Sequence, residues 1–141
     1  MNFDLDRFKK AQELDYPYAL EEIKNGCKQS HWMWYIFPQL KALGFSPTAQ
    51  YYGISGIEEA KAYIADELLR KRFIEISEAL LSLKTSNATQ VMGYPDDLKL
   101  KSCMTLFNEA APEIEVFTKV LDKYFAGQKD IKTLEILGKK N

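Results

Sequence analysis

Residues 30–40 read Ser-His-Trp-Met-Trp-Tyr-Ile-Phe-Pro-Gln-Leu and contain the one histidine and both tryptophans of the sequence. In a helix, residues four apart share a face, as Trp32 and Ile36 do, and the other large side chains of this stretch cover the remaining faces. A helix that is apolar on all sides must be buried or line a pocket. Pro38 restricts Phe37 to extended geometry, so the sequence predicts one or two helical turns and then a bend. We call residues 30–40 the aromatic segment.

The sequence on either side of the aromatic segment is patterned for helices. Apolar residues recur at helical spacing from Leu5, and Tyr16-Pro17 is expected to break that stretch into two helices. Ser55-Gly56-Ile57-Glu58 has the form of a capping box, in which serine and glutamate bond free amides at a helix start. Because no alternating strand pattern exceeds four residues, the sequence indicates an all-α fold: a single compact domain, residues 1–141, of about seven to nine mostly short helices. We predict helices over about 5–14, 17–24, 48–52, 57–65, 66–83, 98–110, 114–125 and 130–137.

Composition and charge exclude several classes of function. The 141 residues include 19 basic and 20 acidic ones, for a formal net charge of −1, and 46% are hydrophobic. This balance offers no basic field to a phosphate backbone, so nucleic acid is not an expected partner. Two distant cysteines and one histidine are too few ligands for a structural zinc site, and we expect neither a metal nor a cofactor. Without a secretory signal or an apolar run of roughly 18 residues, the chain is expected to be cytoplasmic and not membrane-bound. The oligomeric state stays open.

His31 is the first candidate for chemistry. A histidine with an ordinary pKa of about 6.5 serves as acid, base or hydrogen-bond donor near neutral pH. A lone histidine among aromatic residues also often has a packing role, so both interpretations remain open. A working imidazole needs a partner that fixes its tautomer, and carboxylates commonly do this. Asp97 follows a Gly-Tyr-Pro turn that can bring a helix start toward another element, so we predict that it lies within direct or single-water hydrogen-bond reach of His31.

Three aromatic residues are candidates for binding. Trp32, Trp34 and Tyr52 could stack on a planar ligand, although packing of the core would require the same residue types. Trp32 and Trp34 face different ways on a helix, and one of them is expected to line a cavity. Ser30 adjoins His31 and is included in the ligand-binding set, but adjacent serine and histidine are no hydrolase triad, which is defined by spatial roles.

The helix start near residue 96 adds polar candidates. Lys99 and Ser102 lie within its first turns, where free backbone amides and a lysine suit a phosphate or a carboxylate. The alternative is a solvated ion pair between Asp97 and Lys101, which share a face at i,i+4. No glycine-rich phosphate loop is present, which argues against an ATPase.

Four stretches resemble one family of small helical bacterial proteins, the domain of unknown function 1810. They are residues 30–40, Tyr-Gly-Ile-Ser at 52–55, Asp-Asp-Leu-Lys-Leu-Lys-Ser-Cys-Met-Thr-Leu-Phe at 96–107 and Thr-Leu-Glu-Ile-Leu-Gly at 133–138. The resemblance covers nearly the whole chain and implies an all-α fold without a settled activity. Members sometimes carry the label calpastatin, yet calpastatin is a disordered inhibitor, whereas a chain that is 46% hydrophobic can build a core.

A fainter resemblance is to the helical NADAR family, which is associated with NAD and ADP-ribose metabolism and includes N-glycosidases. The Glu-His-Tyr-Tyr element of that family would fall near Tyr51-Tyr52, where this chain has Ala49-Gln50 in place of glutamate and histidine. The departure removes the carboxylate implied for glycosidic cleavage. Glu58, Glu59 and Asp97 are the residues that could replace it.

We therefore expect a pocket for a nucleotide-like or heterocyclic ligand, with His31, Trp32, Trp34 and Asp97 in its wall. If the protein is an enzyme, N-glycosidic or phosphoester hydrolysis suits these residues, with Asp97 or Glu58 as the base for water and His31 as the acid. The alternative is a non-catalytic protein–protein interaction module that uses the aromatic segment as a groove. The exposure of the two tryptophans distinguishes a concave pocket from a flat apolar patch.

Overall fold

The elements of the computed structural model are helices, joined by short turns. The predicted domain spans residues 1–141, of which the structure describes residues 2–139. Within them no β-strand occurs, and one isolated bridge joins Leu40 to Ile54. The all-α class and the predicted number of about seven to nine helices are confirmed. Besides a 3-10 turn, η1 Lys41–Leu43, the described residues form α1 Asp6–Lys24, α2 Met33–Ile36, α3 Pro47–Tyr52, α4 Ile57–Ala65, α5 Glu67–Ser82, α6 Ala88–Met92, α7 Asp96–Ala110, α8 Glu115–Phe125 and α9 Ile131–Ile136.

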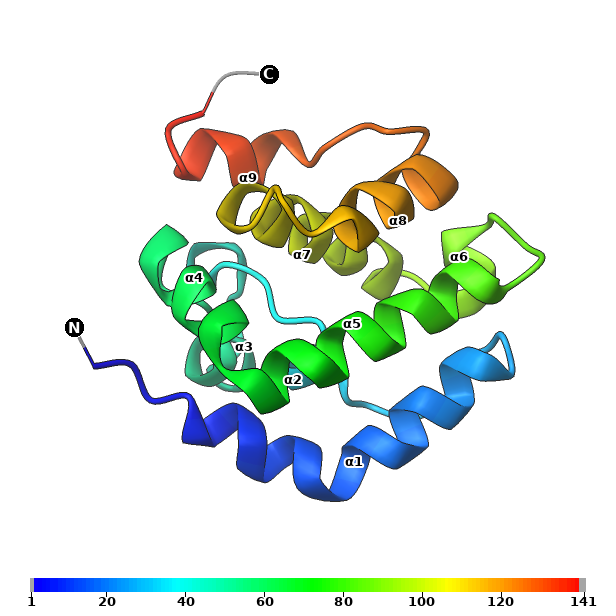
Figure 1. Ribbon diagram of the computed structural model, residues 1–141, viewed down its shortest axis with the longest axis horizontal. Coiled ribbons are helices and arrows are strands. Elements are labelled where there is room, and N and C mark those ends of the chain that lie inside the picture. Colours follow the sequence, from blue (N-terminus) through cyan, green and yellow to red (C-terminus); the bar gives the residue numbers. More distant parts are fainter. Residues whose placement is uncertain (1, 140–141) are drawn as a thin grey trace.

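α5 crosses the middle of the molecule, with α1 packed on one side and α8 on the other (Figure 1). α7 contacts α4, α6, α8 and α9, so these two long helices organise the packing. At the centre, Phe73 of α5 is 1% exposed and its ring meets four others. These are the rings of Phe37, Tyr63, Phe107 and Phe117, with centroids 4.8–6.1 Å away. The aromatic segment and the helices α4, α5, α7 and α8 therefore share one aromatic core. None of the helices in residues 2–139 has the length and apolarity needed to cross a bilayer.

The aromatic segment is part of this core. Trp32 is 1% exposed, and Ile36 and Phe37 are also buried. α2 is a single turn, and after it the chain extends until Leu40 pairs with Ile54. The predicted short helix and bend are confirmed, because a proline at position 38 cannot continue the hydrogen-bond ladder of a helix.

The predicted break at Tyr16-Pro17 is wrong. A single helix, α1, runs through Pro17 and is bent along its length (Figure 1). The proline removes one amide donor, but Tyr16 just before it is anchored on α5. Its hydroxyl lies 2.9 Å from the carbonyl oxygen of Arg72 and 2.5 Å from Glu75 Oε1. Packing between α1 and α5 offsets the local preference for a break.

Helix starts are decided by side-chain caps at some positions and not at others. Asp66 and Asp130 cap α5 and α9, each accepting from an amide three residues ahead. The prediction of a capping box at Ser55 is wrong. Gly56 is the N-cap of α4, and no side chain caps this helix. The Ser55 amide instead donates to Glu59 Oε1 at 2.7 Å. The Glu59 carboxylate is buried, and it also binds a cation from α1.

That cation is Arg7, which forms a buried ion pair with Glu59. Arg7 Nη1 lies 2.9 Å from Glu59 Oε2, and the two side chains are 8% and 4% exposed. The guanidinium also donates to the carbonyl oxygens of Tyr51 at 2.9 Å and Gly53 at 3.1 Å. One planar cation thus joins α1, α4 and the end of α3.

Candidate functional site

A carboxylate from α1, Glu22, holds the start of the aromatic segment. Its Oε1 accepts from the Gln29 amide at 2.8 Å, the Ser30 amide at 2.9 Å and Trp32 Nε1 at 2.9 Å. Its Oε2 accepts from the Ser30 hydroxyl at 2.7 Å. Burial raises the pKa of Glu22, but the hydrogen bonds from Ser30, Gln29 and Trp32 outweigh it and hold the pKa below its ordinary value of 4.5. Ser30 and Trp32, both predicted to bind ligand, are therefore engaged within the protein.

We expect Glu22→Gln to lower the free energy of unfolding at pH 7 by about 1–2 kcal/mol, because an amide cannot accept all four hydrogen bonds. The pKa of Glu22 is lower in the folded chain than the ordinary 4.5. Its stabilisation is therefore complete above about pH 4.5 and is lost as the pH falls through the lowered pKa. Urea unfolding of both proteins from pH 7 to pH 3 should show the difference shrink below pH 4.5. Glu21→Gln, an exposed neighbour, is the control; an equal effect there would contradict the role of Glu22.

Lys28 fastens the same segment to the start of α7. Its ammonium lies 2.8 Å from Asp96 Oδ2, 2.5 Å from the carbonyl oxygen of Ser30 and 4.9 Å from the centroid of the Trp32 ring. Its backbone amide donates to the carbonyl oxygen of Val91 at 2.7 Å. An aspartate at a helix start commonly caps it, but Pro95 is the N-cap of α7 and the Asp96 carboxylate is used in this ion pair.

The structure does not form the predicted contact between His31 and Asp97. The His31 side chain is exposed, and within residues 2–139 no hydrogen bond joins it to Asp97. Asp97 is 7% exposed; its Oδ2 accepts from the Thr89 hydroxyl at 2.5 Å and its Oδ1 from the Leu98 amide at 2.9 Å. The turn between α6 and α7 brings Thr89 to Asp97, so the Asp97 carboxylate stabilises this turn by a hydrogen bond across it.

Trp34 and Lys99 are the predicted residues that the structure brings together at a hollow. The Lys99 ammonium lies 5.7 Å from the centroid of the half-buried Trp34 ring. The hollow that they line with Phe37 and Gln39 has a volume of about 10 Å³. Such a volume holds about one water molecule, so a nucleotide base does not fit there.

The other predicted site residues lie apart. Tyr52 packs its ring against Tyr35, with centroids 5.0 Å apart. Ser102 is buried and donates to the carbonyl oxygen of Leu98 at 3.2 Å. Glu58 is exposed in the first turn of α4. Within residues 2–139 no group of three or more histidine, cysteine, aspartate or glutamate side chains could hold a metal ion.

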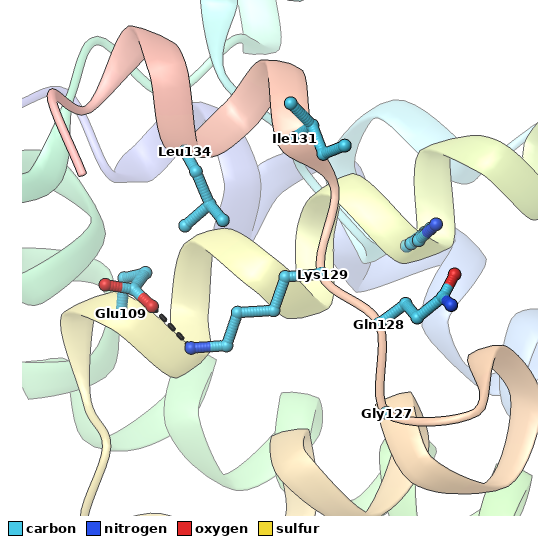
Figure 2. A pocket seen from close by; sticks show the side chains of 7 residues that line it. Glu109, Gly127, Gln128, Lys129, Ile131 and Leu134 are labelled. Atoms are coloured by element: carbon cyan, nitrogen blue, oxygen red, sulfur yellow. Dashed lines mark hydrogen bonds and ion pairs between the residues drawn. The ribbon is translucent and has the colours of Figure 1, made fainter. Parts of the chain in front are cut away.

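A larger cavity lies elsewhere, between α7 and α9, and we call it the α7–α9 cavity. Its volume is about 580 Å³. Figure 2 shows Lys129 reaching back toward Glu109 of α7, while Ile131 and Leu134 come from α9. Lys129 Nζ lies 2.5 Å from Glu109 Oε2. The lining residues are Lys101, Glu109, Gly127, Gln128, Lys129, Ile131 and Leu134.

The walls of the α7–α9 cavity are fixed by Thr105, which is fully buried. Its hydroxyl accepts from the Asp130 amide at 2.9 Å and donates to the carbonyl oxygen of Lys101 at 2.8 Å. Asp130 in turn caps α9 by accepting from the Thr133 amide at 2.9 Å. The segment that carries Gln128 and Lys129 is therefore anchored at its end, and the cavity is preformed.

The sequence did not predict the α7–α9 cavity. It also did not predict which residues of the chain contact the aromatic segment. One signal was available: Lys101 and Glu109 are eight residues apart, which places them on one side of a helix. Nothing in the sequence brings Lys129 to Glu109, or Glu22 to Ser30, because those contacts depend on how separate helices pack.

Fold and site together define an all-α domain with an aromatic core and a preformed polar and apolar cavity at one side. The chain belongs to the family described as protein of unknown function DUF1810, whose model matches residues 2–137. It is similar to the conserved hypothetical protein Rv1873 from Mycobacterium tuberculosis, known from a crystal structure. The two share 43% identity with a TM-score of 0.95, over 98% of this chain and 99% of the other. No curated protein matches the chain. The likeness to NADAR proteins stays a prediction.

Proposed function

We propose that this protein is a non-catalytic domain that binds a small molecule in the α7–α9 cavity. One observation carries the proposal: the cavity has a volume of about 580 Å³, against about 10 Å³ at the aromatic segment. Pockets for small ligands have volumes of roughly 300–1,000 Å³ and combine apolar walls with a few polar groups. Ile131 and Leu134 supply the apolar wall, and Lys101 and Gln128 supply polar groups.

The positions of the catalytic candidates support binding over hydrolysis. N-glycosidic or phosphoester cleavage needs an acid and a base that reach the same substrate. His31 is exposed ahead of α2, Glu58 is exposed on α4, and Asp97 is bound by Thr89. A groove for a protein partner at the aromatic segment is likewise disfavoured, because Trp32 is 1% exposed.

The lining also bears on the kind of ligand. Among the described residues that line the α7–α9 cavity none is aromatic, so the lining offers the base of a nucleotide no ring on which to stack. The two branched aliphatic side chains suit an aliphatic group instead. We therefore propose that the ligand is a small amphiphile bound beside α9, and not a nucleotide-like molecule at the aromatic segment.

We expect 1-octanol to shift the backbone amide NMR signals of residues 127–134 in the ¹⁵N-labelled protein. An Ile131→Trp variant should abolish these shifts, because the indole fills the cavity that Ile131 lines. Ile136→Trp on the same helix is the matched control, since Ile136 is exposed, as Ile131 is, but lies outside the lining. Absence of shifts in the wild type, or shifts that survive Ile131→Trp, would overturn the proposed function.

A further inference from the structure

We infer that the α7–α9 cavity selects an amphiphile with an anionic head group, which Lys101 binds. This inference rests on the proposed function and adds the chemical class of the ligand. It concerns carboxylates, sulfonates and phosphates alike, because each offers anionic oxygens to an ammonium group.

The charges around the cavity favour an anion. Of the residues that the structure describes, two lysines and one glutamate line it, which gives this lining a net charge of +1. Lys129 and Glu109 neutralise each other across 2.5 Å. Within residues 2–139 no carboxylate lies within 4.0 Å of the Lys101 ammonium, whereas Lys129 has one. Among the described lining residues, Lys101 is therefore the cation without a carboxylate partner.

The surroundings of Lys101 strengthen its attraction for an anion. Its ammonium lies 6.0 Å from the centroid of the Phe125 ring, and the residue is half-buried. A charge beside an apolar wall is screened less than one in open water. The aromatic face attracts the cation but carries no net charge that would neutralise it. Gln128, exposed in the same lining, adds amide N–H donors.

The opposite wall fits an apolar tail. Figure 2 shows Leu134 on α9 pointing toward Lys129 and Glu109, and Ile131 at the start of the same helix; both residues line the cavity. A molecule with its head at Lys101 can extend its tail along α9. A cationic head group would find the Glu109 carboxylate already paired with Lys129 and would meet repulsion from Lys101.

Three probes of equal chain length test the inference: octanoate, 1-octanol and octylamine at neutral pH. Titrations followed by the amide signals of residues 127–134 should give octanoate a Kd on the order of 1 mM. We expect octanoate to bind about 3–10-fold more tightly than 1-octanol, and octylamine to bind most weakly.

Two variants should change octanoate binding in opposite directions. Lys101→Gln should reduce the affinity about 3–10-fold and leave that of 1-octanol unchanged, because it removes only the charge. Glu109→Gln should increase the affinity, since it frees Lys129. Lys132→Gln, an exposed lysine of α9 outside the lining, is the matched control for charge and should have no effect. Circular dichroism confirms that each variant is folded.

The outcomes separate the inference from the proposed function. If 1-octanol binds at residues 127–134 as tightly as octanoate, or if Lys101→Gln leaves octanoate binding unchanged, the anionic class is wrong and the binding site stands. If none of the three probes shifts these signals, the proposed function itself is overturned. Equal losses in Lys101→Gln and Lys132→Gln would show attraction to overall charge and would also overturn the inference.

Discussion

Phe73→Ala is expected to lower the free energy of unfolding by about 3–5 kcal/mol, because it deletes a ring from the centre of the core. Phe73 is 1% exposed and its ring centroid lies 4.8 Å from that of Phe107 and 4.9 Å from that of Phe117. Its neighbours belong to α7, α8 and the aromatic segment, so a local shift of α5 cannot refill the space. Guanidinium chloride unfolding, followed by circular dichroism, measures the loss.

Ser77→Ala is the matched control for Phe73→Ala. Ser77 lies one turn later on α5, is fully buried, and its hydroxyl has no hydrogen-bond partner within the described residues. Removing an unpartnered hydroxyl deletes no interaction, so we expect a change of less than about 1 kcal/mol. A loss below about 1 kcal/mol for Phe73→Ala would contradict the central position of the ring.

Removing one partner of the Arg7–Glu59 ion pair is expected to lower the free energy of unfolding by about as much as Phe73→Ala does. Arg7→Met leaves a buried carboxylate without its cation, and Glu59→Leu leaves a buried guanidinium without its anion. Each change should cost about 3–5 kcal/mol, because an uncompensated buried charge is strongly destabilising. The double variant should lose less than the sum of the single losses, since it leaves neither charge behind.

A double-mutant cycle in urea measures this coupling between Arg7 and Glu59. Lys9→Met is a suitable control, because Lys9 pairs with Asp66 at 2.6 Å on a more exposed surface, where its side chain is 34% exposed. Exposed ion pairs contribute little to stability, so Lys9→Met should lower the free energy of unfolding much less than Arg7→Met does. Additive losses in Arg7→Met and Glu59→Leu would mean that the two side chains stabilise the protein independently.

Local features of the sequence were enough to predict most of the helices. Asp66 and Asp130 cap their helices through bonds that span three residues, and such contacts form wherever the rest of the chain lies. The aromatic segment had to be buried because its apolar side chains cover every face, and the structure buries Trp32 and Phe37.

Where a local preference competed with packing, the prediction from the sequence was wrong. The preference of Tyr16-Pro17 for a break was real, yet burial of Tyr16 against α5 kept α1 continuous. The capping box at Ser55 failed for a related reason. Its serine amide is bound by Glu59, whose carboxylate is fixed by a cation from a distant helix.

The sequence by itself determined that this chain folds as helices and buries the aromatic segment, because periodicity, capping and proline geometry act over a few residues. Only the tertiary structure decided which polar groups meet. Glu22 reaches Ser30 because the turn after α1 reverses the chain, and Lys129 reaches Glu109 because Thr105 holds the linker against α7. Electrostatic and hydrogen-bonding partners depend on distances of a few ångströms between separate helices, and the packing of the whole core sets those distances.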